Sequence, residues 1–298
     1  MNWNVELPEE PNVQDCCNSG CDPCIFDVYE KQIKLYKTLN DKNKCREEKE
    51  INGISEIKYT AFEVIDTFLI WETLKILKFK NTAINKLRIW WKPGDHFLLK
   101  YYDGERLSCT RAYTPIKLDA DKNKDFDFSI IVKCYTNGLV SNYLFNLEVG
   151  AVTLWRGPYG SYDYKANTFK RIVMIAQGTG IAPFISIIEN ILNNDDDITT
   201  IMLLYCCQSM EEVLFRNELN LYRSYWNFSY EIFLSNFVSN NTTLKYKEPV
   251  TSRRFSVTDI NNLTPFENDQ FLVCGSTKFM QSYGDILKMK GLENIILF

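Results

Sequence analysis

The sequence predicts a β-barrel domain followed by an α/β domain with an open parallel sheet, preceded by a small appendage with cysteines and one helix. Two patterns predict this class. Short aromatic and β-branched segments separated by turn residues fill the middle of the chain, whereas apolar strands alternate with helical segments in its last third. The 298 residues are also enough for two domains. We assign the appendage and a linker to residues 1–50, the barrel to 51–166 and the α/β domain to 167–298.

Composition and charge exclude several classes of protein. The 34 Lys and Arg against 38 Asp and Glu give a formal charge of −4, which argues against a nucleic-acid partner. No segment approaches the roughly 18 consecutive apolar residues of a membrane span, and we expect no cleaved signal peptide. A single histidine leaves little room for His-based catalysis. Scattered cysteines such as Cys134 and Cys206 indicate an intracellular, reducing compartment, which we expect to be the cytoplasm, with an organelle or a membrane-peripheral location as alternatives.

The first 50 residues have the pattern of a separate module. Apolar residues at helical spacing predict one amphipathic helix over residues 24–39, and eight charged residues between positions 41 and 50 predict a linker. Four cysteines lie before the helix: Cys16, Cys17, Cys21 and Cys24. The last three have metal-ligand spacing, but two adjacent cysteines strain a single tetrahedral site. Zinc or an iron–sulfur centre, a redox-active dithiol and an inert docking module therefore all stay open.

The expected strands of the barrel are short and are separated by turn signals such as Asp103-Gly104 and Asn137-Gly138. They are residues 61–64, 97–101, 126–135 and 152–155. From Lys170 onward the pattern changes to buried-type strands that alternate with helices. We expect strands at 171–176, 201–205, 230–234 and 271–274, and helices at 183–192, 211–222 and 278–289.

The most informative local motif is Gly178-Thr179-Gly180-Ile181-Ala182-Pro183, between the first strand of the α/β domain and its first helix. Glycines there let the backbone approach a phosphate, and free N–H groups at a helix start favour an anion. The third glycine of a dinucleotide fingerprint is missing. Taken alone, the motif is equally compatible with a tight turn that binds no ligand.

Several other motifs carry polar or aromatic groups at the ends of predicted strands. Arg111, Tyr113 and Thr114 supply a cation, an aromatic face and a hydroxyl within four residues. The remaining motifs are Lys133-Cys134-Tyr135, Gly138-Leu139-Val140-Ser141-Asn142-Tyr143-Leu144, Trp155-Arg156-Gly157-Pro158-Tyr159-Gly160 and Cys274-Gly275-Ser276. The last of these ends the final parallel strand, where ligands bind in open α/β sheets.

Together and in this order, these motifs resemble the ferredoxin-reductase-like flavoenzymes, specifically the NADH-cytochrome b5 reductase family, over residues 59–298. Residues 15–29 are similar to the oxidoreductase-like cysteine segment that precedes the reductase in one subgroup. The resemblance implies that the barrel binds FAD and that the α/β domain binds a nicotinamide dinucleotide.

The resemblance also implies a role for each matching residue of the barrel. Arg111 would pair with the FAD pyrophosphate, Tyr113 would pack on the flavin, and Thr114 would hydrogen-bond near the ring nitrogens that receive hydride, a catalytic position. Lys133 and Tyr135 would line the same groove. The turn at the next helix start would offer donors to the pyrophosphate through Gly138, Leu139, Val140 and Ser141.

In the α/β domain, the resemblance assigns the dinucleotide phosphates to Gly178, Thr179 and Gly180, with Pro183 beside them. Cys274 and Gly275 would border the nicotinamide, which makes Cys274 the second catalytic candidate. Simpler interpretations stay open, in which Tyr135 and Tyr143 are ordinary barrel aromatics, Gly157 and Gly160 only shape a turn, and Cys274 is a buried thiol.

The sequence departs from the family pattern at the expected dinucleotide site. Ser276 begins a stretch that is usually rich in proline, and Ala182 stands where a threonine is common. Ser235 and Asn236 follow a predicted strand without a carboxylate for a ribose hydroxyl, while Arg253 and Arg254 come soon after. NADH is the expected dinucleotide, with NADPH as the alternative.

These observations predict an FAD-dependent oxidoreductase that takes hydride from NADH. It would then release single electrons to a haem protein such as a cytochrome b5, or to another one-electron acceptor. The acidic charge gives no overall attraction to an acidic cytochrome. The alternative, favoured by the altered residues 182 and 276, is a non-catalytic interaction protein that acts through its cysteine module.

Overall fold

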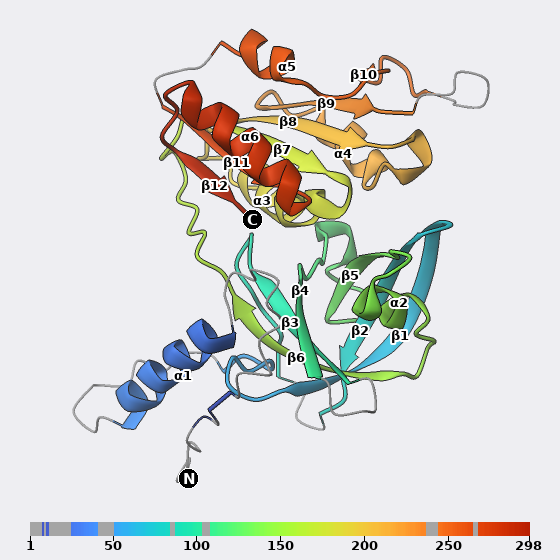
Figure 1. The fold of residues 1–298 in the computed structure, drawn as a ribbon, viewed down its shortest axis with the longest axis vertical. Coiled ribbons are helices and arrows are strands. Elements are labelled where there is room, and N and C mark those ends of the chain that lie inside the picture. Colours follow the sequence, from blue (N-terminus) through green and yellow to red (C-terminus); the bar gives the residue numbers. More distant parts are fainter. Residues whose placement is uncertain are drawn as a thin grey trace.

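The computed structural model describes two stacked domains, a barrel-like antiparallel sheet and a parallel sheet with helices on both faces (Figure 1). Among the described residues, no helix has the length and apolar character to cross a bilayer. The described residues are 8, 10–11, 25–40, 51–83, 87–102, 108–236, 244–264 and 268–298. The fold class predicted from the sequence is confirmed, whereas the exact domain boundaries stay predictions.

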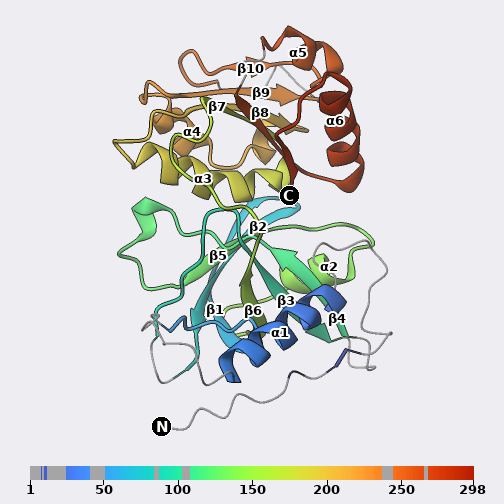
Figure 2. The same ribbon diagram turned by 90° about the vertical axis from the view of Figure 1, so that its left-hand side faces the viewer.

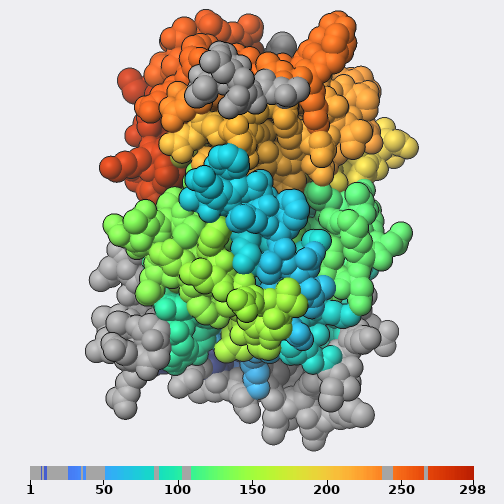
Figure 3. Space-filling model, turned by 90° about the vertical axis from the view of Figure 1, so that its right-hand side faces the viewer, coloured from blue at the N-terminus to red at the C-terminus, as the bar shows by residue number. Residues whose placement is uncertain are grey.

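The first sheet contains six antiparallel strands in the order β4-β3-β6-β1-β2-β5. The strands are β1 (Thr60–Trp71), β2 (Leu74–Asn81), β3 (His96–Tyr102), β4 (Ser108–Tyr113), β5 (Phe128–Lys133) and β6 (Val152–Tyr159). The short helix α2 (Leu139–Phe145) follows β5 and packs on that strand. Of the β1–β2 hairpin only residues 61–64 were predicted as a strand, and the tip of the hairpin reaches the α/β domain (Figure 3).

Aromatic side chains fill the interior of the barrel, as the strand composition predicts. Trp155 is fully buried and lies with its ring 5.3 Å from that of Phe79 and 5.6 Å from that of Phe128. Its indole Nε1 donates to Thr153 Oγ1 at 2.7 Å, which satisfies the one polar atom that burial would otherwise strand. The barrel is therefore a solid core that presents functional side chains only at its ends and surface.

The second sheet is entirely parallel, with the order β10-β9-β8-β7-β11-β12. Its strands are β7 (Arg171–Gln177), β8 (Thr200–Cys207), β9 (Phe228–Leu234), β10 (Val250–Thr251), β11 (Asp269–Cys274) and β12 (Ile295–Leu297). Its helices are α3 (Ala182–Leu192), α4 (Arg216–Tyr222), α5 (Val257–Asn262) and α6 (Thr277–Met289). Alternate residues of β7 face the two layers, so that Met174 packs on the α3 side and Ile175 on the α5–α6 side.

Helix α3 is largely apolar because it lies between the parallel sheet and the barrel (Figure 2). Its residues Phe184 and Ile188 are fully buried. The same apolar cluster includes Ile116 and Ile131 from the barrel. This continuous packing joins the two domains and sets the position of the barrel's strand ends relative to the parallel sheet.

The helix predicted over residues 211–222 is only partly present. A 3-10 turn covers Met210–Glu212, and regular helix begins at Arg216. Phe215 adopts a left-handed conformation with φ of 55°, and the backbone N–H of Leu214 donates to the Tyr205 hydroxyl at 3.3 Å. The single-helix prediction was wrong because this buried tyrosine captures a backbone group that a continuous helix would have used.

Helix α1 (Ile25–Asn40) lies against the outer surface of the barrel. Val28 is buried and packs on Leu98 and Tyr159. Gln32 Nε2 donates to the Glu56 carbonyl at 2.9 Å, and the Tyr159 hydroxyl donates to the same carbonyl. The predicted helix is therefore confirmed and docked, while the cysteines that precede it lie outside the described residues.

Candidate functional site

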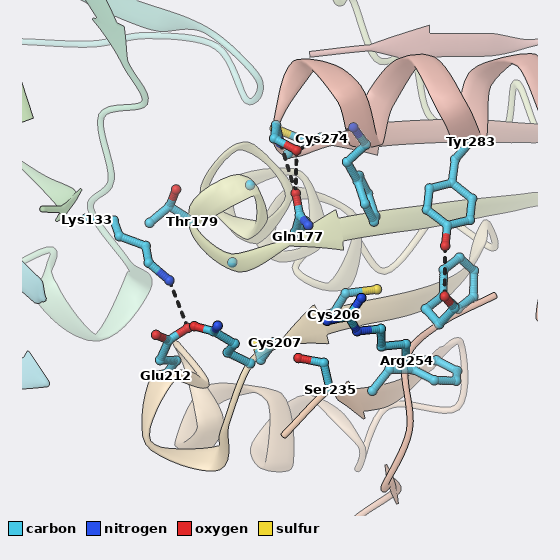
Figure 4. Close-up of a pocket in the computed structure, with 18 of the residues that line it drawn as sticks. Lys133, Gln177, Thr179, Cys206, Cys207, Glu212, Ser235, Arg254, Cys274 and Tyr283 are labelled. Carbon is cyan, nitrogen blue, oxygen red and sulfur yellow. Dashed lines mark hydrogen bonds and ion pairs between the residues drawn. The ribbon is translucent and has the colours of Figure 1, made fainter. Parts of the chain in front are cut away.

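A cleft of about 660 Å³ lies between the two domains, at the carboxyl ends of the central parallel strands (Figure 4). Ligands of open parallel sheets bind at this edge, and the volume suits a small-molecule or cofactor site. Of the residues predicted from the sequence, the barrel contributes Thr114, Lys133 and Tyr135 to the lining, and the α/β domain contributes Gly178, Thr179, Gly180, Pro183, Cys274 and Gly275. The structure thus assembles motifs that lie far apart in the chain.

The remaining predicted residues lie on the barrel beside the cleft rather than in its lining. Arg111 and Tyr113 lie on β4, three residues and one residue before Thr114, and Arg111 Nη1 donates to the Thr110 carbonyl at 2.9 Å. The Tyr113 ring contacts that of Trp155, with 6.0 Å between ring centroids. Burial raises the pKa of Tyr113, so its hydroxyl stays protonated at physiological pH.

The predicted turn at the start of α2 is present, but its hydroxyl is engaged. Ser141 Oγ donates to the Gly138 carbonyl at 3.0 Å and accepts from the Tyr135 N–H at 3.3 Å. A Cβ at Gly138 would lie 2.2 Å from Ser141 Oγ, so only glycine fits there. Leu139 is exposed and Val140 is buried in the barrel core. In this structure Ser141 shapes the turn, and its assignment to a pyrophosphate stays a prediction.

The glycine turn after β7 forms the floor of the cleft. Gly178 has φ of 54°, and its carbonyl accepts a hydrogen bond from the Tyr205 hydroxyl at 3.1 Å. A Cβ at Gly180 would meet the Cys274 carbonyl oxygen at 2.4 Å, which means that the turn packs directly on the end of β11. Burial of Tyr205 raises its pKa and keeps this supporting hydroxyl protonated. The Tyr205 hydroxyl and the end of β11 therefore hold the backbone of the turn in one conformation.

Gln177 is a lining residue that the sequence analysis missed. Its Oε1 accepts hydrogen bonds from the Ser276 N–H at 3.1 Å and from Ser276 Oγ at 2.8 Å. These bonds tie the end of β7 to the start of α6, and Gly275 between them has no room for a Cβ beside the Gln177 side chain. The available signal was its position as the last residue of a strand that runs into a glycine turn.

An ion pair crosses the cleft between the domains. Lys133 Nζ from the barrel lies 2.9 Å from Glu212 Oε2 of the α/β domain (Figure 4). The side chains are only 21% and 10% exposed, so solvent screens the pair less than a surface pair. Glu212 was also missed, because the residue lay inside a helix that the sequence predicted as continuous. The pair places one fixed positive and one fixed negative charge at this wall.

Three cysteine thiols, one buried and two partly buried, lie along the α/β side of the cleft. Burial raises the pKa of Cys274 to about 12 and that of Cys207 to about 12, and it also raises the pKa of Cys206. All three are therefore neutral thiols at physiological pH and weak nucleophiles. This protonation state suits Cys274 as an uncharged neighbour of a ligand ring and argues against thiolate catalysis.

The residues present fit a dinucleotide and a flavin. The side-chain-free backbone at Gly178 and Gly180 admits a phosphate, and Thr179 offers a hydroxyl. On the barrel side, Tyr135 is 56% exposed next to the cleft, an aromatic surface that a flat ring system can cover. FAD would be held on the barrel side and the nicotinamide dinucleotide on the α/β side.

The structure does not test the predicted metal ligands. Cys16, Cys17, Cys21 and Cys24 all lie outside the described residues. Within the part of the chain that the structure describes, no group of three or more His, Cys, Asp or Glu side chains is arranged to hold a metal ion. The metal, dithiol and docking interpretations of the cysteine segment stay predictions.

Comparison with known protein families agrees with the division of the fold. The family described as "Oxidoreductase FAD-binding domain" matches residues 61–164, and "Oxidoreductase NAD-binding domain" matches residues 174–285. The family described as "Oxidoreductase-like protein, N-terminal" matches residues 5–44. Together these matches cover the appendage, the barrel and the α/β domain.

Individual proteins give the same assignment. The NADH-cytochrome b5 reductase-like protein of Homo sapiens is 28% identical, and the alignment covers 97% of this chain and 93% of that protein. NADH-cytochrome b5 reductase 1 of Kluyveromyces lactis is 39% identical over 65% of this chain and 63% of its own. The cytochrome b5 reductase domain of Ulva prolifera nitrate reductase has the same fold, with a TM-score of 0.70 at 23% identity, over 83% of this chain and 100% of that domain.

The fold, the interdomain cleft and these matches define an FAD-dependent oxidoreductase that uses a nicotinamide dinucleotide. Both domains required for that chemistry are present in the described residues. The chain is similar to NADH-cytochrome b5 reductase-like proteins along nearly its whole length, including the oxidoreductase-like N-terminal segment at residues 5–44.

Proposed function

We propose that the chain passes electrons singly from its flavin to a haem protein of the cytochrome b5 kind. The observation that carries this proposal is the similarity to NADH-cytochrome b5 reductase-like proteins along 97% of the chain. A one-electron acceptor also suits the chemistry of a flavin, which accepts a hydride and can release its electrons one at a time.

The contribution of the chain to this reaction is binding and positioning. The backbone of Gly178 and Gly180 would hold the dinucleotide phosphates, and Arg111 and Tyr113 would hold FAD on the barrel. Thr114 and Cys274 line the cleft from its two sides, where a hydroxyl and a neutral thiol give uncharged contacts to the reacting rings. The packed interface around α3 holds the two domains in a fixed relative position. Hydride transfer requires such fixed positioning of the two reacting rings.

Anaerobic spectroscopy of the purified protein tests the flavin and the donor together. We expect a yellow protein whose flavin absorbance bleaches when NADH is added, and we expect NADH oxidation with ferricyanide as acceptor. Protein that stays colourless and inactive with added FAD would contradict the assignment. Bound FAD that NADH does not bleach would support the alternative of a non-catalytic interaction protein.

The acceptor is tested separately, by stopped-flow reduction of purified cytochrome b5 by the NADH-reduced protein. The formal charge of −4 gives no overall attraction to an acidic cytochrome. We therefore expect the rate to change by less than about tenfold between low and physiological ionic strength, unlike electrostatically steered pairs. Activity with ferricyanide but none with cytochrome b5 would refute this acceptor.

We further propose that the protein works in a reducing intracellular compartment, the cytoplasm in the first instance. Cysteines 109, 134, 206, 207 and 274 are all free thiols, as expected where glutathione keeps thiols reduced. Imaging of a tagged full-length chain tests the location. Signal confined to an oxidising, secretory compartment would contradict it.

A further inference from the structure

We propose that Arg254 and Ser235 form a subsite for a ribose 2′-phosphate, so that the cleft accepts NADPH at least as readily as NADH. This inference rests on the function proposed for the cleft, namely the binding of a nicotinamide dinucleotide on its α/β side. It goes further by naming the residues that select between the two dinucleotides.

Both residues lie where the adenosine ribose of a dinucleotide is expected. Ser235 directly follows β9 at the carboxyl edge of the parallel sheet, and Arg254 lines the same cleft. Figure 4 shows the Arg254 and Ser235 side chains near one another, on the side of the cleft away from the Lys133–Glu212 pair. In parallel-sheet dinucleotide sites, a carboxylate after a strand binds the ribose 2′-hydroxyl of NAD, whereas an arginine accommodates the 2′-phosphate of NADP.

The carboxylate that would favour NADH is absent from this position. Ser235 occupies it, and the sequence from residue 236 to residue 244 contains no Asp or Glu. Glu231, four residues earlier on β9, lines a second cavity instead and accepts a hydrogen bond from Thr251 Oγ1 at 2.5 Å. Glu212, also in the cleft lining, is already paired with Lys133.

Of the two adjacent arginines, only Arg254 has an available guanidinium among the described residues. Arg253 makes two hydrogen bonds to Asp259, of 2.8 and 2.5 Å, and Asp259 is further held by Ser256. The Arg254 guanidinium forms no hydrogen bond or ion pair with a described residue, and the side chain is exposed. This cation is therefore free to bind an anion that enters the cleft.

The backbone around Arg254 is held in place on both sides. The Arg253 Nη1 donates to the Arg254 carbonyl at 3.1 Å. The next residue, Phe255, is buried, and its carbonyl accepts from the Tyr283 hydroxyl at 2.8 Å. Anchoring the chain before and after the arginine lowers the entropic cost of fixing its side chain on a ligand.

The chemistry of this pair matches a phosphate monoester better than a hydroxyl. A guanidinium presents a planar set of donors that can bind two phosphate oxygens at once, and the serine hydroxyl adds a third donor. A hydrogen bond to a charged group contributes roughly 1.5–3 kcal/mol, which corresponds to a factor of roughly 10 to 150 in affinity. We therefore expect loss of Arg254 to lower affinity for the 2′-phosphate by roughly tenfold to hundredfold.

Binding of two small probes tests the subsite without relying on activity. Isothermal titration calorimetry of the full chain would compare adenosine 2′,5′-bisphosphate with AMP, which lacks the 2′-phosphate. We expect the bisphosphate to bind at least tenfold more tightly, and Arg254→Gln to remove that advantage. Arg88→Gln, at an exposed arginine outside the cleft lining, is the matched control and should leave both affinities unchanged. Equal binding of the two probes, or an unchanged ratio in Arg254→Gln, would overturn the proposal.

Flavin reduction by the two donors provides the second measurement. We expect kcat/KM for NADPH to equal or exceed that for NADH, and Ser235→Asp to lower the NADPH/NADH ratio at least tenfold by placing a carboxylate beside the phosphate. A wild-type preference for NADH of more than tenfold would overturn the inference. Failure of both donors to reduce the flavin would instead count against the proposed function, and the probe titration would still decide on the subsite.

Discussion

The two walls of the cleft are built in different ways. Around the glycine turn, the α/β wall consists of backbone and small residues, with Gly180 packed against the end of β11 and Gly275 against the Gln177 side chain at the end of β7. The barrel wall consists of longer side chains, of which Lys133 and Tyr135 are examples. Closely packed backbone leaves no room for an added side-chain atom. The conformation of long side chains, in contrast, depends on the residues of the opposite domain that they contact. Substitutions should therefore have larger effects on the α/β wall.

The largest effect is expected from Gly180→Ala. The added Cβ would lie 2.4 Å from the Cys274 carbonyl oxygen, so the glycine turn and the end of β11 must move apart. Overpacking of this kind costs roughly 1–3 kcal/mol of unfolding free energy. A displacement of about 1 Å at the cleft floor should also lower kcat/KM for NADH by roughly a hundredfold. Urea denaturation and steady-state kinetics measure the two effects.

Gly284→Ala is the matched control for Gly180→Ala. Gly284 lies in α6, and a Cβ there would meet only the end of the flexible Leu297 side chain at 3.3 Å. We expect stability to change by less than about 1 kcal/mol and NADH oxidation to be unaffected, because alanine favours a helix. Equal losses in the two variants would contradict the special role of the turn.

The second effect concerns the ion pair between the two walls, Lys133 and Glu212. A double-mutant cycle with alanine at each position should give a coupling free energy of roughly 1–3 kcal/mol, because both side chains are largely shielded from water. Lys92 and Asp163 lie 2.9 Å apart as well, but their side chains are 64% and 58% exposed. The same cycle on that pair should give less than about 0.5 kcal/mol. Similar coupling energies for the two pairs would refute the importance of burial.

The contrast between the walls also explains what the sequence could predict. Gly178 and Gly180 were found because a backbone turn between a strand and a helix has a local signature. Gln177 and Glu212 were missed because their partners, Ser276 and Lys133, are far away in the sequence and only the tertiary fold brings them close. Local chemistry was readable from the sequence, and contacts across the cleft were not.

The same distinction applies to the fold. The buried strands β7, β8, β9 and β11 were predicted within about two residues, since each is a continuous apolar run. Strand β2 was missed although its lysines alternate with apolar residues, the pattern of a half-buried strand. The helix predicted over residues 211–222 was interrupted by the hydrogen bond from Leu214 to Tyr205, a long-range interaction without a local signal.

Acid should affect two buried carboxylates, one in each domain, with opposite sign. In the α/β domain, Glu248 is buried, but hydrogen bonds from Arg216 and from the Lys245 N–H outweigh the cost of burial and hold its pKa below the ordinary value. Its stabilising contribution is therefore complete above roughly pH 4.5 and is lost as the pH falls through the lowered pKa. We expect Glu248→Gln to cost about 1 kcal/mol at pH 7, and the cost to shrink at pH 3.5.

Urea denaturation at the two pH values measures this change, with Glu293→Gln at an exposed carboxylate as the control. The control should leave the unfolding free energy within about 0.5 kcal/mol of the wild type at both pH values. A loss in Glu248→Gln that is the same at pH 7 and pH 3.5 would show that packing, rather than the charge, is responsible.

The smallest effect is expected in the barrel, where burial raises the pKa of Asp95. The fold favours the protonated form of this side chain, so its contribution to stability is greatest below the ordinary pKa near 4 and is lost as the pH rises through the raised value. Asp95→Asn removes the charge while its amide oxygen can still accept from the Lys92 N–H, as Oδ2 does at 2.8 Å. We expect a gain of a few tenths of a kcal/mol at pH 7 that vanishes at pH 4.

Asp195→Asn, at an exposed aspartate, is the control and should leave the unfolding free energy unchanged at either pH. A loss of stability in Asp95→Asn at both pH values would mean that the carboxylate is required as an ion, and the opposite response of the Glu248 and Asp95 carboxylates would then be wrong.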